Sequence, residues 1–270
     1  MPIAELSTGV SVYYEVVGSG EPVLLIMGTG GDHTFWEPTV PAYRGRLQVI
    51  TYDNRGTGQS DCPPDPATYS MRTLADDAAA LLDALGIEAA HVSGLSLGSA
   101  VAQELAINYP KRVRSLQLHC TWGRTDEWLR RVFTDMAYPI HRDDFEHFVK
   151  TAFMWVMSPT YLNERPEDVA LVERAYLLEN PHPPTKEGLL GHLHADLTHD
   201  ALDRLDRIRA RTLITSGEMD WQVPARYGQA VHERIPESRF HLFTGRHSSH
   251  MAFFEMAAEF NELTLAFLSE

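Results

Sequence analysis

The pattern of apolar and polar residues along the chain predicts strands that alternate with helices. Residues 23–27 form a continuous apolar run of strand length, which is typical of a strand buried on both faces of a parallel sheet. Leucine and alanine at helical spacing occupy residues 71–85. Similar strand-like segments lie at residues 47–52, 90–93, 113–118, 212–215 and 239–243, and similar helical segments at 99–109 and 252–268. This order, with right-handed crossovers, predicts an α/β fold.

Two stretches depart from this alternation. The first 20 residues predict a β-hairpin, with residues 10–17 as a strand and Gly18-Ser19-Gly20 as a turn. From Trp122 to about Asp200 only helix-like or loop-like segments occur, interrupted by proline at residues 139, 159, 166 and 181–184. We therefore expect a first core part at residues 1–121, a helical insertion at 122–200 and a second core part at 201–270.

Composition narrows the class of protein. A length of 270 residues with 44% apolar residues suits one large domain, and a net charge of −14 disfavours binding to nucleic acid or an anionic membrane. No apolar run reaches the length of a membrane span, and the N-terminus lacks a signal-like segment. Two cysteines favour a reducing compartment. These features predict a cytoplasmic protein that acts on a small molecule, with homo-oligomerisation left open.

The most informative motif is Gly94-Leu95-Ser96-Leu97-Gly98, which lies between a predicted strand and a predicted helix. In this position a Gly-x-Ser-x-Gly sequence is typical of a nucleophile turn, because small residues on both sides let the helix and the strand approach closely. The turn lifts the hydroxyl of Ser96 above the sheet. The alternative is a glycine-containing turn with an incidental serine, and the flanking strand and helix count against it.

The sequence resembles the α/β-hydrolase superfamily through four motifs. The serine turn is the first of these motifs. The other three are Asp53-Asn54-Arg55-Gly56-Thr57-Gly58-Gln59-Ser60, Gly217-Glu218-Met219-Asp220-Trp221-Gln222-Val223-Pro224, and a late histidine followed by Glu255 and Phe260-Asn261. The resemblance extends over nearly the whole chain outside residues 122–200. It is closest to the cap-bearing branch of esterases, lactonases, C–C bond hydrolases and cofactor-free haloperoxidases. It implies a mostly parallel, eight-stranded sheet flanked by helices, with residues 122–200 as a helical cap.

The resemblance implies a catalytic triad of Ser96, Asp220 and a late histidine. A serine hydroxyl needs a base to take its proton, and a carboxylate must orient that base. Asp126 is the alternative acid, because some members carry the acid after the preceding core strand. For the base we favour His250 over His247, because the family histidine usually lies five residues before a glutamate, here Glu255.

The resemblance also implies an oxyanion hole made by the backbone N–H groups of Thr29 and Leu97. The family commonly has histidine where this chain has Met27, but a backbone donor depends on the chain path and survives the replacement. One such donor contributes roughly 3 to 4 kcal/mol of transition-state stabilisation. Trp36 matches a common family aromatic residue, either in contact with substrate or packed beneath the cap.

Other reactive side chains are expected to be structural. His192, His194, Asp196 and His199 offer metal ligands, but residues at i and i+2 of a helix diverge, so we expect no metal site. Cys62 and Cys120 lack a neighbouring base motif and are not expected to be nucleophiles. No cofactor is expected.

The predicted function is a serine hydrolase that cleaves a carboxylic ester or lactone through an acyl-enzyme. Aromatic and methionine residues are frequent between 122 and 161, and a cap of this composition can wall a cleft for a mainly apolar small molecule. Cleavage of a C–C bond or perhydrolysis would use the same triad, whereas epoxide hydrolases and haloalkane dehalogenases need aspartate at position 96. The alternative of another class is a slow or non-catalytic small-molecule binding protein on the same scaffold.

Overall fold

The core of the molecule is an eight-stranded sheet in the order β1-β2-β4-β3-β5-β6-β7-β8. The computed structural model describes residues 2–270. The strands are β1 (Ile3–Glu5), β2 (Ser11–Gly18), β3 (Glu21–Ile26), β4 (Leu47–Tyr52), β5 (Ala90–Leu95), β6 (Val113–His119), β7 (Arg211–Gly217) and β8 (Arg239–Phe243). β1 with β2 and β2 with β4 are antiparallel pairs, and all pairs from β4 to β8 are parallel. This confirms the predicted mostly parallel, eight-stranded sheet.

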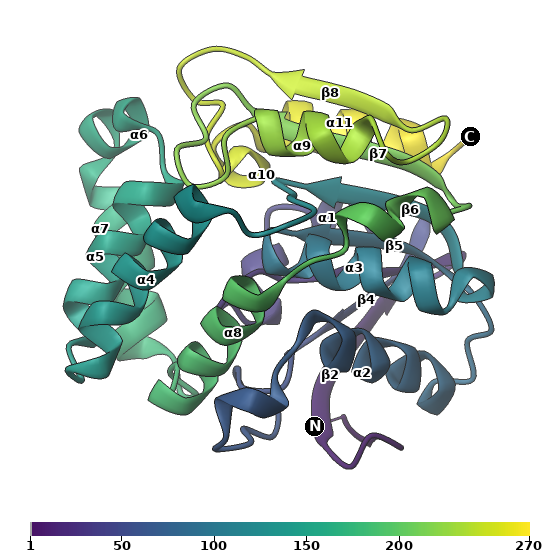
Figure 1. The fold of residues 1–270 in the computed structure, drawn as a ribbon, viewed down its shortest axis with the longest axis horizontal. Coiled ribbons are helices and arrows are strands. Elements are labelled where there is room, and N and C mark those ends of the chain that lie inside the picture. Colours follow the sequence, from purple (N-terminus) through teal and green to yellow (C-terminus); the bar gives the residue numbers. More distant parts are fainter. Residues whose placement is uncertain (1) are drawn as a thin grey trace.

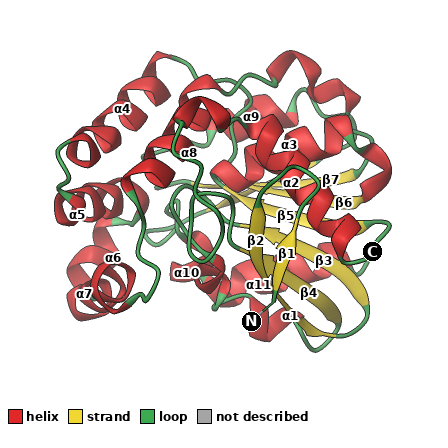
Figure 2. Ribbon diagram, turned by 90° about the horizontal axis from the view of Figure 1, so that it is seen from below, coloured by secondary structure: helices red, strands yellow, loops and turns green. Residues whose placement is uncertain are grey.

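Helices cover both faces of this sheet (Figures 1 and 2). On one face lie α2 (Met71–Ala84), α3 (Leu97–Asn108) and α9 (Arg226–His232), and on the other α1 (Val40–Tyr43), α10 (Ala252–Glu255) and α11 (Ala257–Leu268). Because both faces are covered, the side chains of Val23, Leu24, Leu25 and Ile26 on β3 have no exposed surface. Their continuous apolar run in the sequence has this physical cause.

The N-terminal hairpin exists, but its turn is not where the sequence predicted it. β1 pairs with β2 through a turn in which the N–H of Leu6 donates to the carbonyl of Val10, 2.9 Å away. Gly18 and Gly20 instead lead from β2 to β3, and these two strands do not pair because β4 lies between them. Gly18 has a φ of +81°, and a Cβ there would lie only 2.5 Å from the carbonyl oxygen of Arg44.

A helical segment separates β6 from β7. It contains α4 (Glu127–His141), α5 (Phe145–Val156), α6 (Pro159–Glu164), α7 (Pro166–Arg174), a π-helical turn (Ala175–Glu179) and α8 (Lys186–Thr198). In Figure 1 these helices form a cluster beside the sheet-and-helix core. Arg124 and Asp200 form an isolated antiparallel bridge where the segment leaves and rejoins the core. The boundaries of the cap at 122 and 200 stay a prediction.

Three details of the predicted helices are wrong. Pro139 does not interrupt a helix but lies two residues before the end of α4, whereas Pro159 and Pro166 begin α6 and α7, where a fixed φ is tolerated. The predicted helix 252–268 is divided into α10 and α11 at Met256. The short α1 and α9 were not predicted. No helix within residues 2–270 is both long and apolar enough to cross a membrane.

Candidate active site

Ser96 lies at the sharp turn between β5 and α3, in a backbone conformation that side-chain-bearing residues rarely adopt. Its φ is 55° and its ψ is −123°, and its N–H donates to the carbonyl of His119, 2.9 Å away. A Cβ at Gly94 would collide with the carbonyl of Gly98, and one at Gly98 with the carbonyl of Ile26. Only glycine at both positions therefore allows the helix to start this close to the strands.

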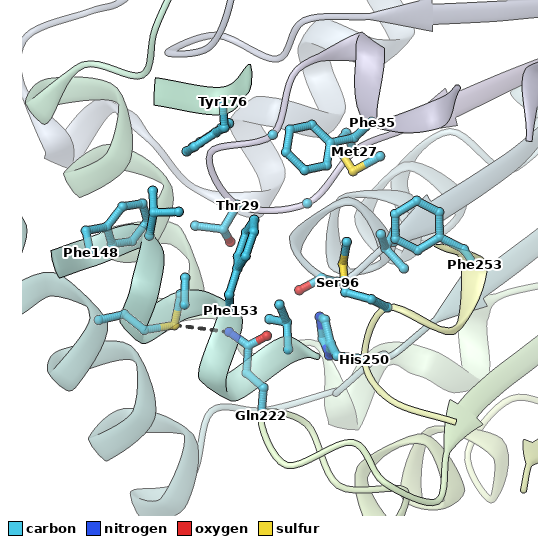
Figure 3. A pocket seen from close by; sticks show the side chains of 18 residues that line it. Met27, Thr29, Phe35, Ser96, Phe148, Phe153, Tyr176, Gln222, His250 and Phe253 are labelled. Atoms are coloured by element: carbon cyan, nitrogen blue, oxygen red, sulfur yellow. Dashed lines mark hydrogen bonds between the residues drawn. The ribbon is translucent and has the colours of Figure 1, made fainter. Parts of the chain in front are cut away.

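Asp220 and His250 meet across two loops that follow β7 and β8. The Nδ1 atom of His250 lies 2.8 Å from Oδ2 of Asp220, and both side chains are buried. The loops are packed so tightly that a Cβ at Gly217 would collide with the carbonyl of Ser248. A carboxylate partner fixes the proton on Nδ1 and leaves Nε2 as the acceptor. Ser96 and His250 line the same pocket, where Figure 3 shows them beside each other.

The alternative acid and base are placed elsewhere. Asp126 caps α4 by accepting from the N–H of Leu129 at 3.1 Å, and it also accepts from the hydroxyl of Tyr227 at 2.6 Å. His247 faces two glutamates, with its Nδ1 3.5 Å from Oε2 of Glu255. The structure thus brings His250, paired to Asp220, to the pocket of Ser96, and Asp126 and His247 do not line that pocket.

The residues that carry the predicted oxyanion donors lie close to Ser96. Leu97 is the first residue of α3, so its N–H has no partner within the helix. Within residues 2–270 the N–H groups of Thr29 and Leu97 donate to no protein acceptor. Gly28 brings the Thr29 loop against Ser96, since a Cβ at Gly28 would lie 3.2 Å from the Cβ of Ser96. The side chain of Asn54 supports this loop by donating to the carbonyl of Met27, 3.1 Å away.

Three side chains of the helical segment also hold the Thr29 loop, and this role was not predicted from the sequence. Nδ1 of His192 accepts from the N–H of Gly30 at 3.0 Å, and Asp196 accepts from the hydroxyl of Thr29 at 2.6 Å. The hydroxyl of Tyr176 donates to the carbonyl of Gly30 at 2.8 Å. These bonds join residues that are 146 to 167 positions apart, so no local spacing in the sequence could indicate them.

Burial keeps the α8 groups uncharged. It raises the pKa of Asp196 to about 8, against an opposing hydrogen bond from Thr29, and lowers the pKa of His192 to about 4. The second ring nitrogen of His192, Nε2, bonds to the carbonyl of Arg55 at 2.8 Å. Both ring nitrogens of His192 are therefore used by backbone groups, so its imidazole serves to position the loop.

The two cysteines differ in their surroundings. Cys120 is buried beside the Asp220–His250 pair, with its Sγ 3.3 Å from the carbonyl oxygen of His250. Burial and the nearby Asp220 carboxylate raise the pKa of this thiol. Cys120 is therefore a thiol rather than a thiolate, which agrees with the expectation that it is not a nucleophile. Cys62 lies at the surface near the hydroxyl of Thr185.

The pocket above Ser96 is small and mainly apolar. Its volume is about 90 Å³, less than the roughly 300–1,000 Å³ of pockets for drug-sized ligands. The side chains that the helical segment contributes are almost all apolar: Met136, Phe148, Val149, Ala152, Phe153, Val156 and Tyr176. Trp36 does not line the pocket but is fully buried against Phe253, with ring centroids 5.8 Å apart. Some aromatic residues of the predicted cap, such as Trp128 and Tyr138, are exposed.

Comparison with known proteins identifies the family. The family model of the alpha/beta hydrolase fold matches residues 21–255. A protein of Azorhizobium caulinodans, named as the carbamate hydrolase RutD, is 34% identical over 261 residues, which cover 96% of this chain and 95% of its own. A hydrolase from Pseudomonas aeruginosa PA01 has a TM-score of 0.88 at 28% identity, covering 100% of this chain and 98% of its own. The enol-lactonase from Burkholderia xenovorans LB400 shares the fold with a TM-score of 0.89 at 24% identity over the whole of both chains. The chain therefore belongs to the α/β-hydrolase family, and it is a hydrolase.

Proposed function

We propose that the protein is a serine hydrolase that cleaves a carboxylic ester or lactone of a small, mainly apolar molecule. The observation that carries this proposal is the convergence of Ser96, in a strained turn, and His250, paired to Asp220, on one apolar pocket. In this proposal Ser96 is the nucleophile, His250 the base and Asp220 the residue that orients it.

The geometry supports a two-step reaction. Oγ of Ser96 attacks the substrate carbonyl while Nε2 of His250 takes the hydroxyl proton, and Asp220 stabilises the imidazolium that forms. The N–H groups of Thr29 and Leu97 donate to the oxyanion. When the tetrahedral intermediate collapses, His250 returns the proton to the leaving oxygen. Water, deprotonated by His250, then attacks the acyl-enzyme, and the Ser96 oxygen leaves with the proton from His250.

The lining of the pocket supports an uncharged substrate. Apart from the titratable His250, no side chain of residues 2–270 that normally carries a charge lines it, so a charged group entering the pocket would lose its hydration without gaining an ionic partner. The small volume favours a short acyl or leaving group close to Ser96.

A carbamate is the second candidate substrate, and the relative from Azorhizobium caulinodans favours it. That relative is named as a carbamate hydrolase and is 34% identical over 96% of this chain. A carbamate carbonyl would use the same nucleophile and oxyanion donors. Esters, lactones and carbamates are therefore compared in one panel, with a vinylogous diketone to test for C–C cleavage and hydrogen peroxide to test for perhydrolysis.

Labelling with a fluorophosphonate tests the nucleophile directly. We expect the wild type to be labelled and Ser96→Ala to remain unlabelled while keeping its circular dichroism spectrum. A wild type that is not labelled and hydrolyses nothing in the panel would refute the proposal and favour a binding protein.

Two histidine variants test the base. We expect His250→Ala to lower kcat on an activated ester at least about a thousandfold, because Ser96 then has no proton acceptor. His247→Ala is the matched control, because its ring faces Glu255 and Glu164, and we expect a change of less than about threefold. The reverse result would exchange the roles of the two histidines.

A further inference from the structure

Gln222 lines the pocket but has no role in the proposed catalytic machinery. Among residues 2–270 it is the one polar side chain of the pocket outside that machinery whose amide or hydroxyl has no oxygen or nitrogen partner. It lies two residues after Asp220 and is only 3% exposed. Two other polar side chains of the pocket are occupied, since the hydroxyls of Thr29 and Tyr176 donate to Asp196 and to the carbonyl of Gly30.

The hydrogen bonding of Gln222 is incomplete. Its Nε2 lies 3.1 Å from Sδ of Met136, and a thioether sulfur is a weak acceptor. Its Oε1 accepts no hydrogen bond from residues 2–270. Figure 3 shows the amide group reaching into the pocket beside Phe153, on the side of His250. Because a thioether sulfur has no proton to donate, the NH₂ group of the amide faces Met136, and Oε1 is the half that is free for a ligand.

Two other buried glutamines, Gln103 and Gln117, also have an Oε1 without a hydrogen-bond partner among residues 2–270, but they differ from Gln222 in two respects. Nε2 of Gln103 donates to Oγ1 of Thr121 at 2.7 Å, and Nε2 of Gln117 donates to the carbonyl of Thr264 at 2.9 Å. Both have oxygen acceptors and neither lines the pocket. Of the three, Gln222 therefore combines a weak acceptor for its Nε2 with a place in the pocket, where a ligand can complete its hydrogen bonds.

We infer that Gln222 is a specificity-determining residue that binds an uncharged hydroxyl or amide N–H of the substrate through Oε1. The inference rests on the proposed ester or lactone hydrolysis and narrows its substrate class. The preferred substrate is a short ester, lactone or carbamate that carries a second, hydrogen-donating group a few bonds from the scissile carbonyl. The apolar lining accommodates the rest of the molecule, and a charged substituent has no partner.

Two pairs of esters that differ only by a terminal methyl or hydroxyl test this inference. On the acyl side the pair is p-nitrophenyl butanoate and p-nitrophenyl 3-hydroxypropanoate. On the alcohol side the pair is propyl acetate and 2-hydroxyethyl acetate. The variant Gln222→Met keeps the length of the side chain and removes its acceptor oxygen.

In at least one pair, we expect Gln222→Met to lower kcat/KM for the hydroxyl ester about tenfold relative to its methyl partner. This is the effect expected from the loss of one hydrogen bond. Gln229→Met, the same change at an exposed position of α9, is the matched control and should leave both ratios unchanged. Equal effects of Gln222→Met on the two members of both pairs would overturn the inference.

The rate of fluorophosphonate labelling separates this result from a failure of the proposed function. If Gln222→Met is labelled at the wild-type rate, its nucleophile and fold are intact, and the ratios report on specificity alone. Gln222→Leu serves as a second apolar variant in case methionine disturbs the packing against Met136. A loss of labelling in the wild type would instead refute the serine hydrolase itself.

Discussion

Single glycines determine whether the serine turn can form. Gly28, Gly94 and Gly98 bring the first turn of α3, the end of β5 and the loop after β3 into direct backbone contact around Ser96. The positive φ of Ser96 is held by its own N–H bond to His119 and by the start of α3. The strained backbone of Ser96 is therefore held by contacts with α3, the end of β5, the loop after β3 and His119 of β6.

Replacement of Gly98 by alanine should be strongly destabilising. Its Cβ would overlap the carbonyl of Ile26 and lie 2.8 Å from that of Met27, and both belong to backbone that cannot move freely. We expect a loss of about 3 kcal/mol or more in the free energy of unfolding, measured by urea denaturation. Gly45→Ala is the control, because no atom of the described residues 2–270 lies within 4 Å of a Cβ at that position. Equal stabilities of the two variants would contradict the packing described.

The ring nitrogen of His250 that carries the proton is determined by a single carboxylate, that of Asp220. Asp220 accepts from Nδ1 of His250 with Oδ2 and from the N–H of Val223 with Oδ1. Asp220→Asn keeps the shape of the side chain, but its amide NH₂ can favour the tautomer with the proton on Nε2, which cannot act as the base. We expect kcat to fall by about 10³- to 10⁴-fold with little change in the melting temperature. An unchanged kcat would remove Asp220 from the proposed triad.

At the scale of elements, the helical segment does more than cover the pocket. His192 and Asp196 on α8, with Tyr176 from the preceding π-helical turn, hold the loop that carries the Thr29 N–H. Near the histidine loop, Glu255 accepts from the hydroxyls of Ser158 and Ser249 at 2.5 and 2.7 Å. Both ends of the proposed site are therefore bonded to the segment between β6 and β7.

The buried Asp196 should make stability depend on pH. Its pKa is about 8 in the folded protein, against an ordinary value of 3.8, so the folded state keeps a proton that the unfolded chain has lost between these values. Rising pH across this window therefore favours the unfolded state. Asp196→Asn still offers Thr29 an acceptor but cannot ionise, so its stability relative to the wild type should rise by roughly 1.4 kcal/mol per pH unit within the window.

Urea denaturation of both proteins at pH 5 and pH 7.5 measures this difference, because titrations shared by the two proteins cancel. If the stabilities of the wild type and Asp196→Asn change in parallel between the two pH values, the pKa of Asp196 is not raised in the folded protein, and the prediction is wrong. The neighbouring Asp200→Asn is a suitable control, since its carboxylate is exposed and pairs with Arg124.

At the scale of the whole molecule, the sequence predicted the sheet well because buried parallel strands leave a strong local signal. Residues 23–26 are apolar without alternation since helices cover both faces of β3. The misplaced hairpin turn at Gly18 and the break at Met256 depend on tertiary contacts. The glycines at 18 and 20 signal a turn, but only the position of β4 decides that β2 and β3 do not pair.

The candidate site also contains residues that local motifs indicate and residues whose role depends on tertiary contacts. Ser96, Asp220 and His250 stand in motifs that strand ends and short loops define, so their positions could be read from the sequence. Gln222 is part of one of those motifs, but its free amide becomes visible only once Met136 and the pocket are in place. His192 and Asp196 sit in a helix whose spacing indicates nothing about a loop more than 160 residues earlier.

The bridge between Arg124 and Asp200 has a consequence for protein engineering. Because the helical segment leaves and rejoins the core at adjacent points, it has the form of an exchangeable cassette. The bonds of α8 limit what can be exchanged, since a graft that replaces Lys186–Thr198 would leave the N–H of Gly30 and the hydroxyl of Thr29 without their acceptors. A graft confined to residues 127–174 would change the walls of the pocket and spare those two acceptors, provided that a serine at position 158 keeps its bond to Glu255. In function, α8 therefore belongs with the core, because it holds the Thr29 loop, although the chain returns to the sheet only after α8.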